Sequence, residues 1–250
     1  MPPRLRRVRD LAVYEHHGTA PDAITQPAVV LIHGAMDRGA GMLRVARRLR
    51  HLDLIRYDRR GYGRSREAGP PKRFQDHVQD LDEVMGTRRC ILLGHSYGGV
   101  IAMALASTAD RRVAGVVSYE APRAWESWWT QPPATDVEPG RAAESFLRHM
   151  IGDELWESLP DRTRDERRAE GVTMIAELNF QTTQRFDARR IDVPLVIGVG
   201  QLSSDRVQRA AMLTSSEAEF GALVTIEGAG HGAHSSHPTE VAALVDLVSE

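Results

Sequence analysis

CILLGHSYGG, residues 90–99, combines an apolar run with a glycine-rich turn around a single serine. The run over 90–93 is typical of a buried strand, and apolar residues continue at helical spacing from 97 to 108. Ser96 therefore occupies a strand-to-helix turn, with Gly94 and Gly98 two positions to either side. Larger side chains there would clash across so tight a turn. The pattern predicts a nucleophile elbow, which lifts the serine hydroxyl out of the sheet and over a helix N-terminus.

The chain on both sides of this turn alternates short apolar runs with amphipathic helical stretches. Such alternation is typical of βαβ units. It predicts an α/β fold in which helices flank a mostly parallel, twisted sheet. The remaining strands are expected at 11–14, 28–32, 52–57, 113–118, 195–199 and 223–226, and further helices at 39–50, 75–85, 205–219 and 239–248.

The alternation stops between residues 121 and 190. This segment has a proline-rich opening and amphipathic stretches, and it contains all four tryptophans of the chain. We interpret 121–190 as a small helical lid inserted into a core domain made of residues 1–120 and 191–250. Trp125, Trp128 and Trp129 are expected to bind the substrate, because aromatic side chains near strand ends commonly line pockets. The alternative is a peripheral helical layer with no role at the site.

A second glycine motif, HGAM at residues 33–36, follows the strand predicted at 28–32. Its glycine lets the chain turn away from the sheet, so that the N–H of Ala35 can point at a substrate carbonyl. Together with the N–H of Tyr97, it would form an oxyanion hole.

A third motif, GAGH at residues 228–231, follows the last predicted strand. A general base for serine must be a histidine on a well-placed loop. His234 and His237 lie close by and compete for this role, but His231 comes first after the glycine-rich turn. We therefore expect His231 to be the base for Ser96.

These motifs and the stretch YDRRGYGRS, residues 57–65, occur in the order and spacing of the α/β-hydrolase superfamily, which the chain resembles over nearly its whole length. The resemblance implies the α/β-hydrolase fold, a lid inserted after the sixth strand, and a triad in the chain order serine, acid, histidine. Asp58 matches a structural loop of the superfamily and not its catalytic acid. Ser96 argues against the members with an aspartate nucleophile, the epoxide hydrolases and dehalogenases.

The triad acid is where the chain departs from the commonest pattern of the superfamily. That pattern puts an aspartate three residues beyond the glycine that ends the seventh strand; counted from Gly200, the position holds Ser203. Asp205 lies two residues further on, where it could equally cap a helix. Glu120 follows the strand at 113–118, where some members carry their acid, although it could also pair with an arginine. We favour Glu120 and keep Asp205 as the alternative acid.

The motifs together predict a serine hydrolase with a Ser-His-acid triad. It would cleave an ester-like bond, in a carboxylester, lactone or related compound, of a small and mainly apolar substrate through an acyl-enzyme. The same fold supports other roles. The alternatives are a ligand-binding or receptor-like protein with little turnover, a cofactor-free haloperoxidase and a carbon–carbon bond hydrolase.

Composition limits the partners of the protein. A formal net charge of −2 does not favour nucleic acid, and no apolar run approaches the ~20 residues of a membrane span. The first residues lack the apolar region of a secretory signal, and Cys90, the only cysteine, excludes an intrachain disulfide. No metal-ligand spacing is present, so neither a metal nor an organic cofactor is expected. We expect a cytoplasmic enzyme with a small-molecule substrate, and a homo-oligomer is left open.

Overall fold

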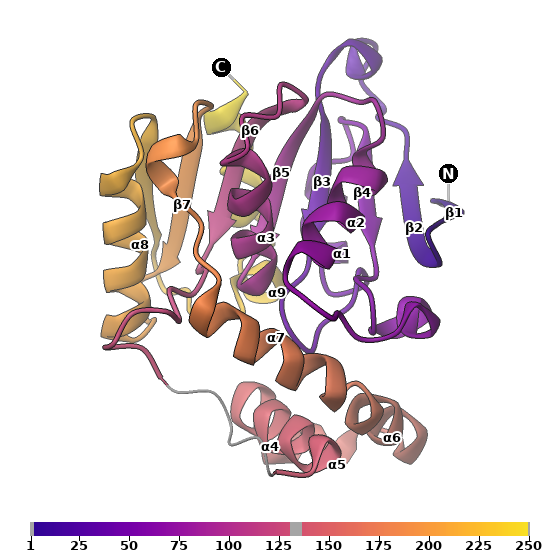
Figure 1. The fold of residues 1–250 in the computed structure, drawn as a ribbon. Helices are drawn as coiled ribbons and strands as arrows, with labels where there is room; N and C mark the ends of the chain where they lie inside the picture. The colour runs from indigo at the N-terminus through magenta and orange to yellow at the C-terminus, as the bar shows by residue number, and fades with distance from the viewer. Residues whose placement is uncertain (1–2, 131–136, 250) are drawn as a thin grey trace.

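An eight-stranded sheet crosses the molecule in the order β1-β2-β4-β3-β5-β6-β7-β8 (Figure 1). The computed structural model describes residues 3–130 and 137–249. β1 and β2 form an antiparallel hairpin at one edge, β2 is antiparallel to β4, and the other neighbours are parallel. The predicted mostly parallel sheet is confirmed. The strands are Arg4–Val8 (β1), Leu11–His16 (β2), Ala28–Ile32 (β3), Leu54–Tyr57 (β4), Cys90–His95 (β5), Val113–Tyr119 (β6), Leu195–Gly200 (β7) and Gly221–Ile226 (β8).

Helices cover both faces of the sheet, which explains the continuous apolar sequences of the central strands. In β3, Val30 joins the core on one face, while Val29 and Leu31 join the core on the other. Helices α2, α3 and α8 pack on the first face, and α1, α9 and α10 on the second. Their bounds are Leu43–Arg48 (α1), Gln75–Met85 (α2), Tyr97–Ala106 (α3), Asp205–Glu217 (α8), Ala233–Ser236 (α9) and Pro238–Ala243 (α10), with short 3-10 helices at Ala23–Thr25, Gly63–Ala68, Ala188–Arg190 and Asp246–Val248.

Helices α4 to α7, here called the cap helices, form a further layer at one end of the sheet (Figure 1). They lie between β6 and β7 in the chain, within the segment for which the sequence predicted a lid. Their buried Trp156, Leu147 and Met174 pack with Met36 and Tyr62 from the sheet region. Across the described residues, no helix is both long enough and apolar enough to span a membrane. The cap helices are Pro139–Ile151 (α4), Asp153–Ser158 (α5), Asp161–Ala169 (α6) and Gly171–Thr183 (α7).

Buried ion pairs attach the cap helices to the rest of the protein. Glu177 of α7 pairs with Arg59, and both side chains are almost completely buried. Glu177 also accepts a hydrogen bond of 2.7 Å from the Tyr62 hydroxyl. A second buried carboxylate, that of Glu170, lies 2.8 Å from the guanidinium of Arg38. Because a buried charge is costly without a partner, charge as well as apolar contact specifies where α7 lies.

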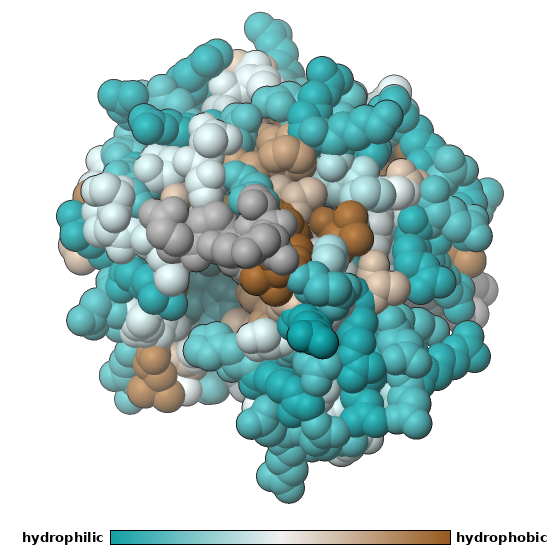
Figure 2. Space-filling model, turned by 60° about the horizontal axis from the view of Figure 1, so that its bottom comes forward, coloured by the Kyte–Doolittle hydropathy of each residue, from teal (hydrophilic) through white to brown (hydrophobic). Residues whose placement is uncertain are grey.

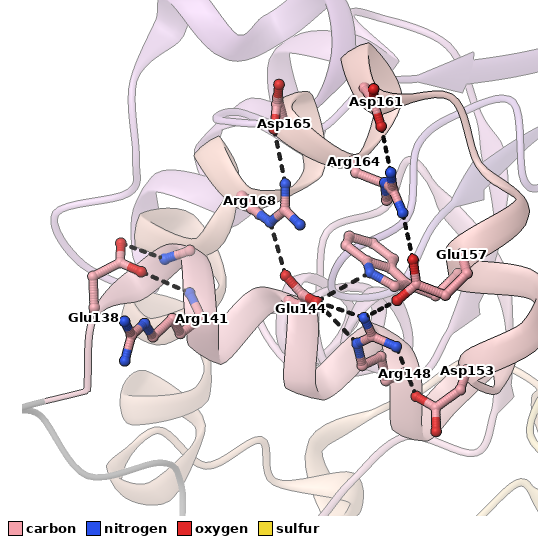
Figure 3. A network of polar contacts seen from close by, with 12 residues as sticks. Glu138, Arg141, Glu144, Arg148, Asp153, Glu157, Asp161, Arg164, Asp165 and Arg168 are labelled. Carbon is pink, nitrogen blue, oxygen red and sulfur yellow. Dashed lines mark hydrogen bonds and ion pairs between the residues drawn. The ribbon is translucent and has the colours of Figure 1, made fainter.

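The outer surface of the cap helices carries a network of arginine–carboxylate contacts (Figure 3). Arg148 of α4 lies 2.8 Å from Glu144 and 2.9 Å from Asp153 of α5. Arg168 of α6 reaches the same Glu144 at 2.8 Å. These pairs are partly exposed to solvent and are screened by salt. They therefore orient three short helices relative to one another and add little to global stability.

Candidate active site

The predicted catalytic residues lie together at the carboxyl edge of the parallel strands. Ser96 follows β5, Glu120 follows β6, and His231 lies on the loop after β8. Ala35 lies on the loop after β3, and all four residues line one cavity. In open α/β sheets, the crevice at this edge is where ligands bind.

Backbone geometry at Ser96 explains the glycines of the elbow. Ser96 has φ 53° and ψ −121°, in the positive-φ region that few non-glycine residues adopt, and it directly precedes helix α3. A Cβ atom on Gly94 would lie 2.4 Å from the backbone of Gly98. A Cβ atom on Gly98 would lie 2.2 Å from the carbonyl oxygen of Ile32. Both positions therefore exclude any side chain, and the strained turn holds the serine at the cavity.

His231 and Glu120 form a hydrogen-bonded pair, with 2.7 Å between Nδ1 and Oε2. The Glu120 side chain is fully buried, whereas His231 is one-third exposed. Burial by itself raises the pKa of Glu120, but hydrogen bonds from His231 and Ser203 outweigh it and hold that pKa below its ordinary value. The ionised carboxylate accepts the Nδ1 proton, so the other ring nitrogen of His231, Nε2, carries the lone pair that a base needs.

The other oxygen of Glu120 is bound at the end of β7. It accepts a hydrogen bond of 2.8 Å from the Gly200 N–H and a short one from the Ser203 hydroxyl. Ser203 is the position where the commonest family pattern has its acid, and here its hydroxyl supports the carboxylate of Glu120 instead. Asp205 is the exposed first residue of α8 and has no hydrogen bond to His231. The structure thus brings Glu120, and not Asp205, to the histidine.

Two side chains next to the site fix the loop that carries His231. His95 Nε2 donates to the carbonyl of His231 at 2.8 Å, and the Tyr119 hydroxyl donates to the carbonyl of Gly230 at 2.9 Å. His95 precedes the elbow serine, and Tyr119 precedes Glu120. The residues next to the serine and the acid therefore position the histidine loop.

The two N–H groups predicted for the oxyanion hole have no competing acceptors. The Tyr97 N–H is the first of helix α3, where no acceptor exists within the helix. The Ala35 N–H makes no hydrogen bond to another residue in the described part of the chain. The helix N-terminus adds a partial positive charge beside Ser96. An oxygen that gains negative charge in this cavity would thus find unpaired donors.

Arg59 holds the loop that carries Ala35. Its guanidinium donates to the carbonyls of His33 and Gly34, each at 2.9 Å, and its backbone N–H donates to His33 Nε2 at 2.9 Å. The positive charge is balanced by Glu177 from the cap helices. Sequence analysis missed both residues. The available signal was a glutamate on a helix among apolar residues, but its partner lies 118 positions away.

The cavity at Ser96 has a volume of about 420 Å³ and is bounded by the sheet edge, by α8 and by two cap helices. On the face that Figure 2 brings forward, hydrophobic side chains gather near the middle and hydrophilic ones surround them. The apolar lining of the cavity comes from Trp129, Phe146, Met150, Leu178, Leu202 and Val207.

The three tryptophans predicted to bind substrate lie in different surroundings. Trp129 lines the cavity. Trp125 packs edge-on against Phe186, with 4.9 Å between ring centroids. Trp128 lies under the guanidinium of Arg209, 4.5 Å from its ring centroid. Of the three, the contacts favour a substrate role for Trp129 alone.

A larger cavity, of about 560 Å³, shares no lining residue with the one at Ser96. Arginines and the structural Asp58 dominate its walls. Asp58 accepts hydrogen bonds from the N–H groups of Gly39 and Arg64, at 2.8 and 2.9 Å. Among the described residues, the larger cavity is lined by no serine, cysteine or histidine, whereas the smaller one is lined by Ser96, Glu120 and His231, so we place the chemistry at the smaller one.

The chain belongs to the α/β-hydrolase family. A family model described as "Alpha/beta hydrolase family" matches residues 29–244, most of the chain. The match includes the elbow, the loop after β3 and the histidine loop.

Solved structures with the same fold are named for different enzyme activities. The enol-lactonase from Burkholderia xenovorans has a TM-score of 0.74 at 18% identity, covering 99% of this chain and 100% of that one. The bromoperoxidase from Bacillus anthracis has a TM-score of 0.71 at 20% identity, with the same coverage. A thermophilic esterase from Thermogutta terrifontis has a TM-score of 0.68 at 16% identity, covering 97% of each chain. Identities this low establish a shared fold and assign no substrate.

Proposed function

We propose that this protein is a serine hydrolase that cleaves an ester-like bond of a small, mainly apolar substrate through an acyl-enzyme. The observation that carries the proposal is the 2.7 Å contact between His231 Nδ1 and the buried carboxylate of Glu120, in the cavity that Ser96 lines. A neutral histidine oriented by an ionised carboxylate beside an elbow serine is the arrangement that activates a hydroxyl nucleophile.

The first half of the reaction acylates Ser96. His231 Nε2 takes the hydroxyl proton while Oγ forms a bond to the substrate carbonyl carbon. The carbonyl oxygen gains the electron pair and accepts hydrogen bonds from the N–H groups of Ala35 and Tyr97. When the intermediate collapses, the bond to the leaving oxygen breaks, and the imidazolium of His231 returns its proton to that oxygen. Glu120 stays ionised and stabilises the imidazolium.

The second half releases the acid product. Water gives a proton to His231 Nε2 and attacks the acyl carbon, and the same two N–H groups hold the second oxyanion. Collapse then breaks the bond to Ser96 Oγ, which recovers its proton from His231. No step needs a redox partner.

The cap helices supply the lid in this proposal, as predicted for residues 121–190. Support comes from Phe146 of α4 and Leu178 of α7, which line the cavity together with Trp129. Enclosure by apolar side chains excludes water and favours an apolar acyl or ring group. The esterase and lactonase names among the similar structures agree with ester-like chemistry. We also propose that the enzyme works in the cytoplasm.

The test is Ser96→Ala, assayed by hydrolysis of p-nitrophenyl esters and by labelling with a fluorophosphonate. We expect turnover to fall roughly 10⁴- to 10⁶-fold and labelling to disappear. Ser107→Ala is the matched control, because Ser107 ends the same helix and bonds only the carbonyl of Ala104 at 2.9 Å.

Retention of more than about a tenth of the activity by Ser96→Ala would remove the nucleophile assignment. A wild-type protein that is labelled but shows no turnover on any ester or lactone would instead support the receptor-like alternative. Cleavage of a carbon–carbon bond without ester hydrolysis would support the carbon–carbon bond hydrolase. Turnover of halide and peroxide without ester hydrolysis would support the cofactor-free haloperoxidase.

A further inference from the structure

Three neighbouring residues of the described chain each have a buried side-chain atom without a hydrogen-bond partner: Oδ2 of Asp37, Nδ1 of His95 and Nδ1 of His234. Asp37 lies on the loop after β3, His95 is the last residue of β5, and His234 belongs to α9. One potential ligand atom from each residue lies within 4.8 Å of the other two. The rings of His95 and His234 are 4.1 Å apart between centroids. Unpaired buried polar atoms are rare in folded proteins, so this cluster requires an explanation.

Hydrogen bonding fixes which atom of His95 is available. Its Nε2 donates to the carbonyl of His231 at 2.8 Å, so its Nδ1 carries a lone pair in the neutral ring. That Nδ1 is one of the unpaired buried atoms, on a residue only 5% exposed. A histidine that donates one nitrogen to a backbone carbonyl and presents the other is in the usual state of a metal-bound histidine.

Asp37 and His234 do not form a hydrogen bond with each other. Asp37 uses Oδ1 to accept from the Arg38 N–H at 2.7 Å, which leaves Oδ2 unpaired. The distance from this Oδ2 to His234 Nε2 is 3.8 Å, too long for a hydrogen bond. Two imidazoles in contact also repel when both are protonated. A cation placed between the three residues would give Asp37 Oδ2 and His95 Nδ1 the partner that each lacks, with His234 Nε2 as the third ligand.

We propose that Asp37, His95 and His234 bind a divalent transition-metal ion, best matched by zinc. Two neutral imidazoles and one carboxylate form a ligand set typical of zinc with an open fourth position. Ligand atoms about 2.1 Å from a tetrahedral ion are about 3.4 Å apart. The ligand atoms lie within 4.8 Å of one another, so any pair must close by at most about 1.4 Å. Small rotations about the χ angles provide this movement.

Such an ion would join three loops at once. Asp37 follows Ala35 by two residues, His95 precedes Ser96, and His234 follows His231 by three. The ion would thus fix the oxyanion loop, the elbow and the histidine loop relative to one another without touching the substrate. The proposed effect of the ion is to position these loops, and it holds whether or not the proposed ester hydrolysis is correct.

Binding is tested directly, without an activity assay. Protein dialysed against EDTA and then against chelator-free buffer is titrated with zinc chloride in a calorimeter. We expect one high-affinity site per chain, and a rise in Tm of roughly 5–10 °C at free zinc a hundredfold above Kd. Asp37→Asn and His234→Gln should each weaken binding at least tenfold. His237→Gln, three residues further along and outside the cluster, should leave it unchanged.

Cobalt chloride provides a second measurement on the wild-type protein alone, in case the variants fail to fold by circular dichroism. Four-coordinate cobalt(II) absorbs strongly in the visible, while six-coordinate cobalt absorbs weakly. Strong absorption that zinc abolishes would support the site. Absence of zinc binding, equal binding by His234→Gln, loss of binding in His237→Gln, or only weak six-coordinate cobalt would each overturn the proposal and leave ordered water as the partner of these atoms.

Discussion

Glu120 combines a strained backbone with a buried charge. Its φ of 53° is unusual for a non-glycine residue and costs on the order of 1–3 kcal/mol. Its N–H still donates to the carbonyl of Gly198 at 3.0 Å, so the sheet continues through the strained residue. The strain turns the side chain toward Gly200, Ser203 and His231, where hydrogen bonds compensate for burial of the carboxylate.

Replacement of this carboxylate gives the first prediction at the residue scale. Glu120→Gln keeps the shape of the side chain but removes the counter-charge of the imidazolium, so kcat should fall roughly 10²- to 10⁴-fold while the protein stays folded. Asp205→Asn is the control, because no hydrogen bond or ion pair joins Asp205 to His231; its kcat should change less than about threefold. Steady-state kinetics on one ester decide whether Glu120 or Asp205 is the triad acid. A larger loss of kcat in Asp205→Asn than in Glu120→Gln would assign that role to Asp205.

Arg206 is a cation at the wall of an otherwise largely apolar cavity. Its guanidinium lies 5.9 Å from the ring centroid of Trp129, and no ion pair joins it to another described residue. A substrate with a carboxylate at its far end would pair with it. We predict that Arg206→Gln raises KM about tenfold for an ester bearing a carboxylate, with little change for the neutral ester of equal size. An equal change for both esters would contradict a charge-specific contact.

Sequence analysis predicted the site residues that lie within recognisable local motifs. Ser96 and His231 each lie in a glycine motif whose shape requires the surrounding residues. The acid was not decided by sequence, because Glu120 and Asp205 both follow strands that end at the same edge, and only side-chain direction separates them. Arg59 and Glu177 were missed because their pairing depends on how the cap helices fold back over the sheet.

At the scale of elements, the cap helices depend on one buried carboxylate. Glu177 contacts Arg59, Tyr62 and His77, and all four side chains are buried. We predict that Glu177→Gln lowers the free energy of unfolding by about 3–5 kcal/mol, because it leaves the charge of Arg59 buried without a partner. Turnover should fall as well, since Arg59 holds the oxyanion loop. Denaturant titration and esterase kinetics measure the two effects.

Glu166→Gln is the matched control for this change. Glu166 also pairs with an arginine outside the cap helices, Arg38, but the Glu166 side chain is one-third exposed and water can replace it. Its loss should cost less than about 1 kcal/mol. Comparable losses in the two variants would mean that burial of Glu177 is not what anchors α7.

Prediction of elements failed where local sequence carries little apolar signal. Strand β1 was missed because it is an arginine-rich, mostly exposed edge strand. The turn that follows has positive φ at Arg9 and Asp10, although neither residue is the glycine that such a hairpin favours. The helix expected at 39–50 forms only over Leu43–Arg48, and the last helix divides into α10 and a 3-10 turn. The helix at Gln75–Met85 was predicted with both ends correct, because its apolar face packs on the sheet core.

For the whole molecule, buried histidines link stability to pH. Burial, reinforced by neighbouring positive groups, lowers the pKa of His33 and of His95 well below the ordinary value. Neutral His33 accepts the Arg59 N–H through Nε2 and donates to the Gly34 carbonyl through Nδ1, so a second proton would break the first bond. Burial also lowers the pKa of His77, despite its contact with Glu177.

The sign of the pH effect follows from proton binding. Below pH ~6.5 these histidines bind protons in the unfolded chain but not in the native protein, so stability must fall as pH falls. We predict a loss of roughly 1.4 kcal/mol each for His33 and His95 between pH 7.5 and 5.5. The pKa of Glu120 and that of Glu177 are both lowered, so these carboxylates stay ionised in this window and do not contribute. Urea titrations at three pH values, with EDTA present to exclude metal binding, give the slope. His95→Asn should remove the share of His95, roughly 1.4 kcal/mol, from the loss over this pH range. A stability independent of pH from 7.5 to 5.5 would show that the native protein binds protons at these buried rings as readily as the unfolded chain does.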